Sequence, residues 1–344
     1  MKQKKTYGAI DNFRLVAALL IVAIHTAPLK SFNATADYLV TYCFGRIAVP
    51  FFFLVTGFFV LAPYERALFQ TPAAGRKAFR KTGTFLKRTT ALYAAATLLY
   101  LPVKVYSKQL GGIWESIQEI LFDGTFYHLW YLPAVLLGCL FVMALMRTCS
   151  PSTGFLVTIV LYLIGVFGDS YYHLVEHIPV IGACYQGIFA ISAYTRNGIF
   201  FAPVFLWIGA VIANQNIRMP ASHAAAGFLV SLAGMLAEGY LTYQMEWQKH
   251  NSMYLFLLPV MCFLFLLLLS VKGKAFWAAR DVSMYIYIIH PLCIILVRGA
   301  ASVTNMKKLL VGQSLVHYIA VSMLSVGLSL MLAYGMRRLK SNAR

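Results

Sequence analysis

Charged residues are scarce in this chain, and acidic residues are the scarcest. Only 12% of its 344 residues are charged, with 11 Asp or Glu against 29 Lys or Arg, and 60% are hydrophobic. Soluble domains are about a quarter charged and about half apolar, so this composition excludes an ordinary soluble domain. A mean hydropathy of +0.72 points the same way and predicts a chain whose solvent is lipid.

The patterns of metal-binding and disulfide-bonded chains are also missing. The six cysteines are scattered, with no Cys-x-x-Cys pair and no Cys/His ligand spacing, so we expect neither a metal site nor a disulfide framework. A formal charge of +18 suggests nucleic acid at first sight. The basic residues, however, lie in short segments between apolar runs and form no interleaved face, which argues against a nucleic-acid partner.

Apolar runs of roughly 20 residues, the length that crosses a bilayer, are abundant instead. They predict an all-α polytopic membrane protein that forms one domain over residues 1–344, with the lipid bilayer as a partner. Ten spans are expected, at 11–29, 42–62, 88–106, 128–147, 153–169, 198–215, 222–242, 252–271, 281–300 and 313–336.

Residues 178–195 compete as an eleventh span, and the basic residues decide against it, because Lys and Arg accumulate on the cytoplasmic side. Ten spans with both termini cytoplasmic place 19 basic residues inside and 8 outside. An eleventh span would move the basic C-terminal segments outside. We therefore expect 178–195 to be an outer re-entrant or interfacial segment. The basic segment 63–87 is expected to be a cytoplasmic loop, either with an amphipathic helix on the inner leaflet or as a plain determinant of topology.

The first span carries an arginine and a histidine, and ionisable side chains inside a membrane are costly enough to mark functional positions. Arg14 and His25 are expected about 20° apart around the helix and about 16 Å apart along its axis. Asp11 is expected to cap the helix start and to pair with Arg14. The alternatives are an arginine that snorkels to the interface and a histidine that hydrogen-bonds a neighbouring helix.

Five further polar residues fall near the outer ends of predicted spans, at the level of His25. With His25 they predict a polar cavity that opens outward, and they are Arg46, His128, Trp130, Arg196 and Glu238. Interface anchoring by His128 and Trp130, and a plain loop charge at Arg196, remain alternatives. His290 lies mid-helix before Pro291, where support of a kink and chemistry are both open.

These residue types suit a reaction that crosses the membrane. Histidine acts as a general base toward a hydroxyl, and arginine holds phosphates through its planar fork. Arg14 on the inner side and His25 on the outer side would fit a cytosolic donor that carries phosphate and an acceptor outside.

Four motifs resemble the acyltransferase-3 family of membrane proteins. They are Ile10-Asp11-x-x-Arg14-x10-His25, the stretch Pro50–Phe58 with Thr56 where Ser is usual, His128-Leu-Trp130-Tyr-Leu, and Ser283–Pro291. The resemblance implies ten helices and transfer of an acyl group, commonly acetyl from acetyl-CoA, to an acceptor on the far side of a bacterial cell (inner) membrane. It implies His25 as base and Arg14 as a contact of the CoA donor, with Arg76, Lys77 and Arg88 of the basic segment beside it. Arg46, His128 and Trp130 would shape the acceptor pocket.

A narrower resemblance, carried by Thr195-Arg196-Asn197-Gly198 and the general run of the chain, is to the membrane half of the vancomycin-resistance serine racemases. In those proteins a cytoplasmic racemase domain follows the membrane part, so such a domain is a possible partner here. This resemblance implies import of L-serine as the alternative to acyl transfer. Arg46 or Arg196 would then bind a carboxylate and Glu238 an ammonium group. A structural or sensing domain is the third possibility, while the absence of inverted repeats favours the enzyme over a transporter.

Overall fold

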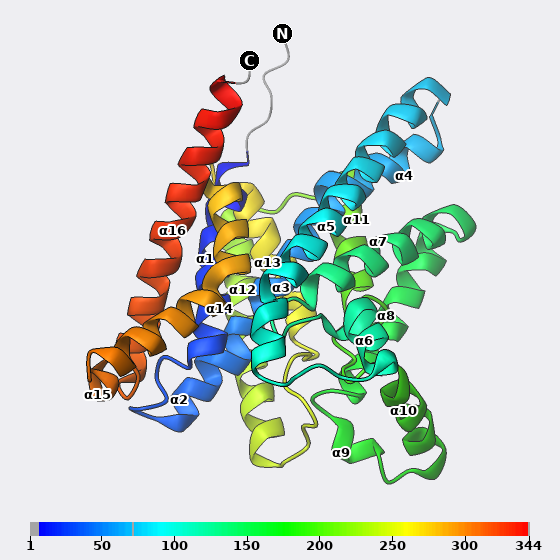
Figure 1. The fold of residues 1–344 in the computed structure, drawn as a ribbon. Coiled ribbons are helices and arrows are strands. Elements are labelled where there is room, and N and C mark those ends of the chain that lie inside the picture. The colour runs from blue at the N-terminus through cyan, green and yellow to red at the C-terminus, as the bar shows by residue number, and fades with distance from the viewer. Residues whose placement is uncertain (1–6, 71, 343–344) are drawn as a thin grey trace. The chain divides into compact units, whose positions relative to one another are not determined.

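The computed structural model describes residues 7–70 and 72–342, and over that part of the chain it is helical with no β-strand. In chain order the helical segments are α1 (Gly8–Thr26), α2 (Ala34–Tyr38), η1 (Leu39–Cys43), η2 (Phe44–Ile47), α3 (Ala48–Thr56), η3 (Gly57–Leu61), α4 (Ala62–Leu68), α5 (Pro72–Tyr106), α6 (Ile113–Gln118), η4 (Glu119–Asp123), α7 (Tyr131–Thr148), α8 (Pro151–Phe167), α9 (Tyr172–Val175), α10 (Pro179–Ile191), α11 (Ala202–Asn214), α12 (Ala221–Gln244), α13 (Leu257–Ser270), α14 (Ala279–Val303), α15 (Lys307–Leu310) and α16 (Ser314–Asn342) (Figure 1).

The lengths and compositions of these helices are those of a polytopic membrane protein. Among the described residues, six segments are long and apolar enough to cross a bilayer: Gly8–Thr26, Ala34–Leu68, Tyr131–Thr148, Ala221–Gln244, Ala279–Val303 and Ser314–Leu339. Large apolar side chains such as Leu229, Val230 and Met323 are exposed on them, as lipid-facing residues are. The predicted all-α membrane fold is thereby confirmed, while the side on which each terminus lies stays a prediction.

The other four predicted spans also coincide with helix. Three match the shorter apolar helices α8, α11 and α13, and 88–106 is the apolar second half of α5. Residues 178–195 contain α10, whose 13 residues are fewer than the roughly 20 that cross a bilayer.

The segment 63–87, where a helix within the expected loop was one of the arrangements considered, is almost entirely helical. Helix α4 ends at Leu68 and α5 begins at Pro72, and proline is well suited to the first turn of a helix, where its missing N–H would have no helical partner. The Ala, Lys and Arg residues that follow favour helix as well. The cytoplasmic placement of this segment stays a prediction.

The chain divides into two compact units. The first comprises Met1–Val49, Met219–Leu236 and Phe263–Arg344, and the second comprises Pro50–Arg218 and Ala237–Cys262.

The first unit is built on α1, α14 and α16, which pack side by side (Figure 1). Small residues of α1, Ala18 and Val22, meet Val282, Ile286 and Cys293 of α14 in a core whose members are almost fully buried. Helix α14 has the largest buried face, because it packs on both α1 and α16. The packing of these three helices fixes the positions of the polar residues of α1 relative to those of α14.

The second unit is centred on α11. This helix is apolar around its whole circumference, which is the pattern of a helix buried on all sides, and Phe205 and Trp207 are almost completely buried. Two glycines allow its backbone to touch that of a neighbour. A Cβ on Gly209 would lie 2.2 Å from the Leu54 carbonyl oxygen, and one on Gly57 would lie 2.0 Å from the Leu206 carbonyl oxygen.

Candidate functional site

The start of α1 is held against the segment that precedes α14. A Cβ on Gly8 would lie 2.1 Å from the Gly273 carbonyl oxygen, so only glycine permits this approach. The Asn12 amide donates to the Lys274 carbonyl oxygen (3.0 Å) and accepts from the Phe276 N–H (2.7 Å). These contacts place the first turn of α1 beside Arg280.

Asp11 joins two arginines at this end. Its Oδ1 accepts from Arg14 Nε at 3.3 Å and from Arg280 Nε at 2.8 Å, and its Oδ2 accepts from Arg280 Nη2 at 2.8 Å. The predicted pairing of Asp11 with Arg14 is confirmed. The predicted capping role is wrong, because α1 begins at Gly8, too early for Asp11 to stand at the cap position. The result is a cluster of two guanidiniums on one carboxylate, with Arg280 largely exposed.

The other end of α1 carries His25, which is half-buried and lies directly before the end of the helix. Ala27 ends it in the left-handed conformation with φ 50°. The ring of His25 stacks on that of His290 in α14, with centroids 5.2 Å apart and planes inclined by 22°. A histidine of the first span and one of a late span are therefore a single structural feature.

Pro291 determines how the His290 ring is held. Because proline has no N–H, the Tyr287 carbonyl lacks its helical donor four residues later. His290 Nδ1 lies 2.9 Å from that oxygen and 3.1 Å from the Ile286 carbonyl oxygen. Both partners only accept, so Nδ1 carries the hydrogen, and Nε2 of a neutral ring is an acceptor. His290 thus donates to the carbonyl that Pro291 leaves without a helical donor, which fits the expected support of the kink, and its role in chemistry stays a prediction.

A pocket of about 410 Å³ opens beside His25. Its polar lining includes two cations, Lys30 and Arg298, and a second histidine, His317. Tyr42 also lines it, and Arg46, one of the predicted pocket residues, lies with its guanidinium 5.2 Å from the centre of the Tyr42 ring. Arg46 therefore lies against a residue of the pocket wall without lining the pocket itself.

The remaining predicted pocket residues belong to the second unit, where Arg196 is central. Its guanidinium lies 4.2 Å from the Tyr194 ring centre and 5.2 Å from that of Trp130, and Nη1 donates to Ser252 Oγ at 3.2 Å. The structure thus brings Trp130 and Arg196 together. His128 is almost fully buried, with its ring 4.9 Å from that of Tyr100.

Glu238 holds a loop in place. Its oxygens accept from the Tyr171 hydroxyl (2.8 Å) and from the backbone N–H groups of Leu255 (2.6 Å) and Phe256 (2.9 Å). Both oxygens are engaged and the residue is buried, so its carboxylate fixes the entry to α13. Its expected contact with an ammonium group stays a prediction.

Asp169 is a buried carboxylate that sequence reasoning missed. Its Oδ1 accepts from the N–H groups of Ser252 (2.6 Å) and Met253 (2.9 Å), and its side chain is completely buried. The signal was present, because an acidic residue ends the predicted span 153–169. His250 lies close by with its ring 4.4 Å from that of Tyr194, and burial lowers the pKa of His250.

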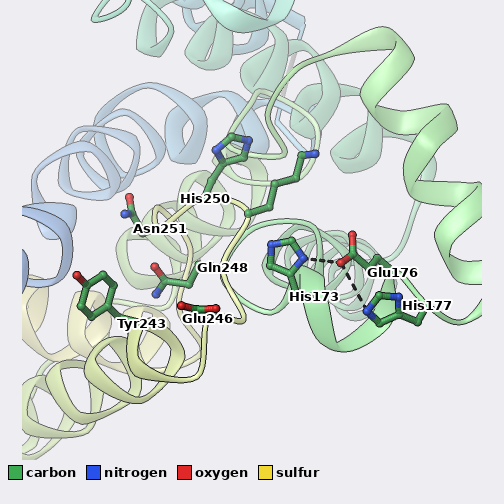
Figure 2. A pocket seen from close by; sticks show the side chains of 9 residues that line it. His173, Glu176, His177, Tyr243, Glu246, Gln248, His250 and Asn251 are labelled. Carbon is green, nitrogen blue, oxygen red and sulfur yellow. Dashed lines mark hydrogen bonds and ion pairs between the residues drawn. The ribbon is translucent and has the colours of Figure 1, made fainter.

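A pocket of the same unit, of about 570 Å³, is lined by polar side chains from residues 173–177, at the end of α9 and just after it, and from the 243–251 segment (Figure 2). Glu176 accepts from His173 Nδ1 at 2.5 Å and lies 3.7 Å from His177 Nε2. This contact with His173 holds the pKa of the Glu176 carboxyl below its usual value. No cluster of three His, Cys, Asp or Glu side chains in the described ranges has the arrangement of a metal site.

The basic residues expected to contact a CoA donor lie on α5. Arg76, Lys77 and Arg88 are exposed, and Lys77 and Arg88 line a shallow hollow of about 500 Å³ with Arg80, Lys81 and Phe85. Lys77, Lys81 and Arg88 recur at helical spacing and therefore share one face. This face offers several cations to a polyphosphate, and its contact with a CoA donor stays a prediction.

Comparison with known proteins agrees with the motifs. A family model described as an acyltransferase domain matches residues 7–334. An amino-acid racemase of Enterococcus faecalis is 40% identical over 99% of this chain and 47% of that protein, and a serine/alanine racemase of Enterococcus gallinarum is 35% identical over 92% of this chain and 45% of that protein. This chain spans about half the length of these relatives. No solved structure matches it.

Proposed function

This chain belongs to the acyltransferase-3 family of membrane proteins, and from that premise we propose that it transfers an acyl group from cytosolic acyl-CoA to a hydroxyl on the extracytoplasmic side of a bacterial cell membrane. The observation that carries the proposal is the position of His25. It is a half-buried imidazole beside a polar pocket, stacked on a second imidazole that the Tyr287 carbonyl orients.

In the proposed reaction His25 is the general base. It takes the proton of the acceptor hydroxyl while that oxygen forms a bond to the carbonyl carbon of the thioester. The carbon–sulfur bond breaks, and the proton leaves with the CoA thiolate, so the products are an ester and free CoA. The contact with His290 fixes the ring plane of His25, and so the direction in which its nitrogen faces the acceptor.

The donor side of the proposal rests on the basic end of α1. Arg14 lies about 16 Å from His25 along the helix axis, in the cluster with Asp11 and Arg280. Arginine matches phosphate oxygens through its planar fork, and the exposed guanidinium of Arg280 adds a second fork beside it. We propose that Arg14 contacts the phosphate-bearing part of acetyl-CoA, and that Arg76, Lys77 and Arg88 of α5 add to its attraction.

The test is release of free CoA by the full chain reconstituted in liposomes, with labelled acetyl-CoA outside the vesicles and bacterial envelope extract inside. We expect release by the wild-type chain and a loss of at least a hundredfold in His25→Ala, the size of effect that a general base has. His177→Ala is the matched control, because His177 is an exposed histidine of the other unit. Equal release by wild type and His25→Ala would overturn the proposed role of His25.

A second candidate function is delivery of L-serine across the membrane. The relatives named for racemization of serine, alanine and other amino acids favour it, and the cations Lys30 and Arg298 beside His25 suit a carboxylate. The racemase activity of the relatives would then belong to a cytoplasmic partner domain. Accumulation of labelled L-serine in the same liposomes, without CoA release and surviving His25→Ala, would establish transport over acyl transfer.

A further inference from the structure

The pocket beside His25 is lined by positive charge without a counter-charge. Lys30 and Arg298 line it together with His25 and His317, and among its lining residues, all within the described ranges, none is acidic. Asp37 of the same unit is buried and turned elsewhere, because its Oδ1 accepts from the Leu29 N–H at 2.8 Å and the Thr41 hydroxyl at 3.4 Å. A molecule that enters this pocket therefore meets two cations and no acidic side chain.

The two cations come from different elements and converge on one space. Lys30 lies in the turn after α1, and Arg298 lies in the last third of α14. Neither forms an ion pair with another residue of the described part of the chain. A carboxylate or a phosphate between them would accept from both, and such charge-assisted hydrogen bonds are stronger than neutral ones.

His317 offers a specific contact for a hydroxyl. Its ring is almost fully buried, and Nδ1 lies 2.9 Å from the Leu310 carbonyl oxygen, so Nδ1 carries the hydrogen. Nε2 of the neutral ring is then an acceptor, and this buried atom has no hydrogen-bond partner among the described residues. Buried polar atoms of folded proteins are almost always satisfied. A hydroxyl group that donates to Nε2 would complete the site.

The walls of the pocket are tied together, so these groups are held at fixed places. Ser31 Oγ and Ser314 Oγ lie 2.8 Å apart, Ser314 Oγ donates to the Pro28 carbonyl oxygen at 2.8 Å, and Ser31 N–H donates to Ser314 Oγ at 3.1 Å. The turn that carries Lys30 is thereby bound to the first residue of α16, the helix that carries His317.

We propose that this pocket binds a small molecule, or the end of a larger one, that carries a carboxylate or phosphate beside a hydroxyl. Lys30 and Arg298 bind the anionic group, and His317 Nε2 accepts from a hydroxyl. That this molecule is the acyl acceptor rests on the proposed function, whereas its binding does not.

The test uses the full chain in lipid nanodiscs without any acyl-CoA, and three probes that differ in charge. Glycerol is neutral, glycerate adds a carboxylate, and glycerol 3-phosphate adds a phosphate. We expect isothermal titration to show at least one charged probe binding about tenfold or more tightly than glycerol, which is the effect of one charge-assisted hydrogen bond. The charged probe that binds more tightly identifies the anionic group.

Matched variants distinguish direct binding of the anionic group by Lys30 and Arg298 from a nonspecific attraction by the positive charge of the region. Lys30→Gln and Arg298→Gln should each weaken binding of the charged probe about tenfold. Lys308→Gln removes the same charge from α15, which does not line the pocket, and should change binding less than twofold. His317→Asn keeps a donor toward Leu310 but removes Nε2, so it should weaken all hydroxylated probes that bind.

Equal binding of glycerol and both charged probes, failure of both charged probes to bind, or binding insensitive to Lys30→Gln and Arg298→Gln would overturn the proposal. The experiment also distinguishes failure of this binding proposal from failure of the proposed acyl transfer. A charged probe that binds as expected but is never acylated when acetyl-CoA is added would sink the proposed reaction and leave the pocket assignment intact.

Discussion

The imidazole of His290 stacks on that of His25, with centroids 5.2 Å apart and planes inclined by 22°, and its own orientation comes from a carbonyl that Pro291 leaves without a helical donor. His290 is completely buried, whereas His25 borders the pocket. His290 therefore acts on the proposed reaction by positioning His25. Its effect on the rate can be measured separately from that of His25 by replacing each residue in turn.

Replacement of His290 should slow the proposed acyl transfer without preventing acceptor binding. In His290→Asn the amide can still donate to the Tyr287 carbonyl, but the ring that backs His25 is lost. We expect kcat to fall about tenfold to a hundredfold, the cost of a small misplacement of a catalytic group, with an unchanged KM for the acceptor. Steady-state CoA release measures both. A higher KM with an unchanged kcat would mean that His290 shapes the pocket and does not position the base.

Loss of the Asp11 charge should destabilise the first unit. Asp11→Asn cannot hold the two-pronged contact with Arg280, and hydrogen bonds to charged groups contribute about 1.5–3 kcal/mol each. We expect a loss of about 2 kcal/mol in the free energy of unfolding, measured by denaturant titration in detergent. Asp281→Asn, at an exposed position beside Arg280 in the sequence, should change it by less than about 0.5 kcal/mol. Equal effects of the two variants would show that Asp11 stabilises the unit only as a nearby negative charge and not through its hydrogen bonds to Arg280.

Alanine at Gly209 should wedge two helices of the second unit apart. The added Cβ would lie 2.2 Å from the Leu54 carbonyl oxygen, and neither backbone can give way cheaply. We expect a cost of about 1–3 kcal/mol. Gly83→Ala in α5 meets no atom within 4 Å and should stabilise the helix by about 0.5–1 kcal/mol. Thermal unfolding of both variants tests this opposite sign, and destabilisation by Gly83→Ala would contradict it.

Acidification should loosen the segment around His250. Burial lowers the pKa of His250, with Arg196 and Lys249 lowering it further and Asp169 opposing them. Because the pKa in the folded state is below the unfolded value of about 6.5, the neutral ring stabilises the fold fully above pH 6.5, and this is lost as the pH falls. The hydrogen-exchange protection factors of amides 249–253, which correct for the slower intrinsic exchange at lower pH, should therefore fall between pH 7 and pH 5.

His250→Gln should flatten this dependence, whereas His177→Gln, at an exposed ring, should not. Glu176 contributes nothing in that interval, because its pKa is lowered from an already acidic value and its loss of charge comes at lower pH. An unchanged profile in His250→Gln would assign the pH response to another group.

The helices were predictable because each buries or exposes a long apolar run, a signal that is local in the sequence. The pairing of Asp11 with Arg14 was predictable for the same reason, since residues three apart share a helix face. Arg280 was not, because it is 269 residues away along the chain and reaches Asp11 only through the packing of α1 on α14.

In the candidate site, too, features that are local in the sequence were predictable and features that depend on helix packing were not. His25 and His290 were each recognisable as costly polar residues within spans, but their stacking depends on which helices pack together. Lys30, Arg298 and His317 were not among the predicted site residues. Their convergence on one pocket depends on the turn after α1 being bound to α16 through Ser31 and Ser314. Arg14 was predicted from its place in the first span and from the family motif, and Arg46 and the α5 cations mainly from their charge and position, so the roles of all of them stay predictions.

Pro291 also strengthens one tautomer of the ring before it. Any other residue at that position would return an amide hydrogen to the Tyr287 carbonyl, and Nδ1 of His290 would keep only the Ile286 carbonyl oxygen, 3.1 Å away, as an undivided acceptor. The preference for a hydrogen on Nδ1 over Nε2 would then be weaker. The imino acid thus biases the chemistry of a side chain that precedes it, through a hydrogen atom that it does not have.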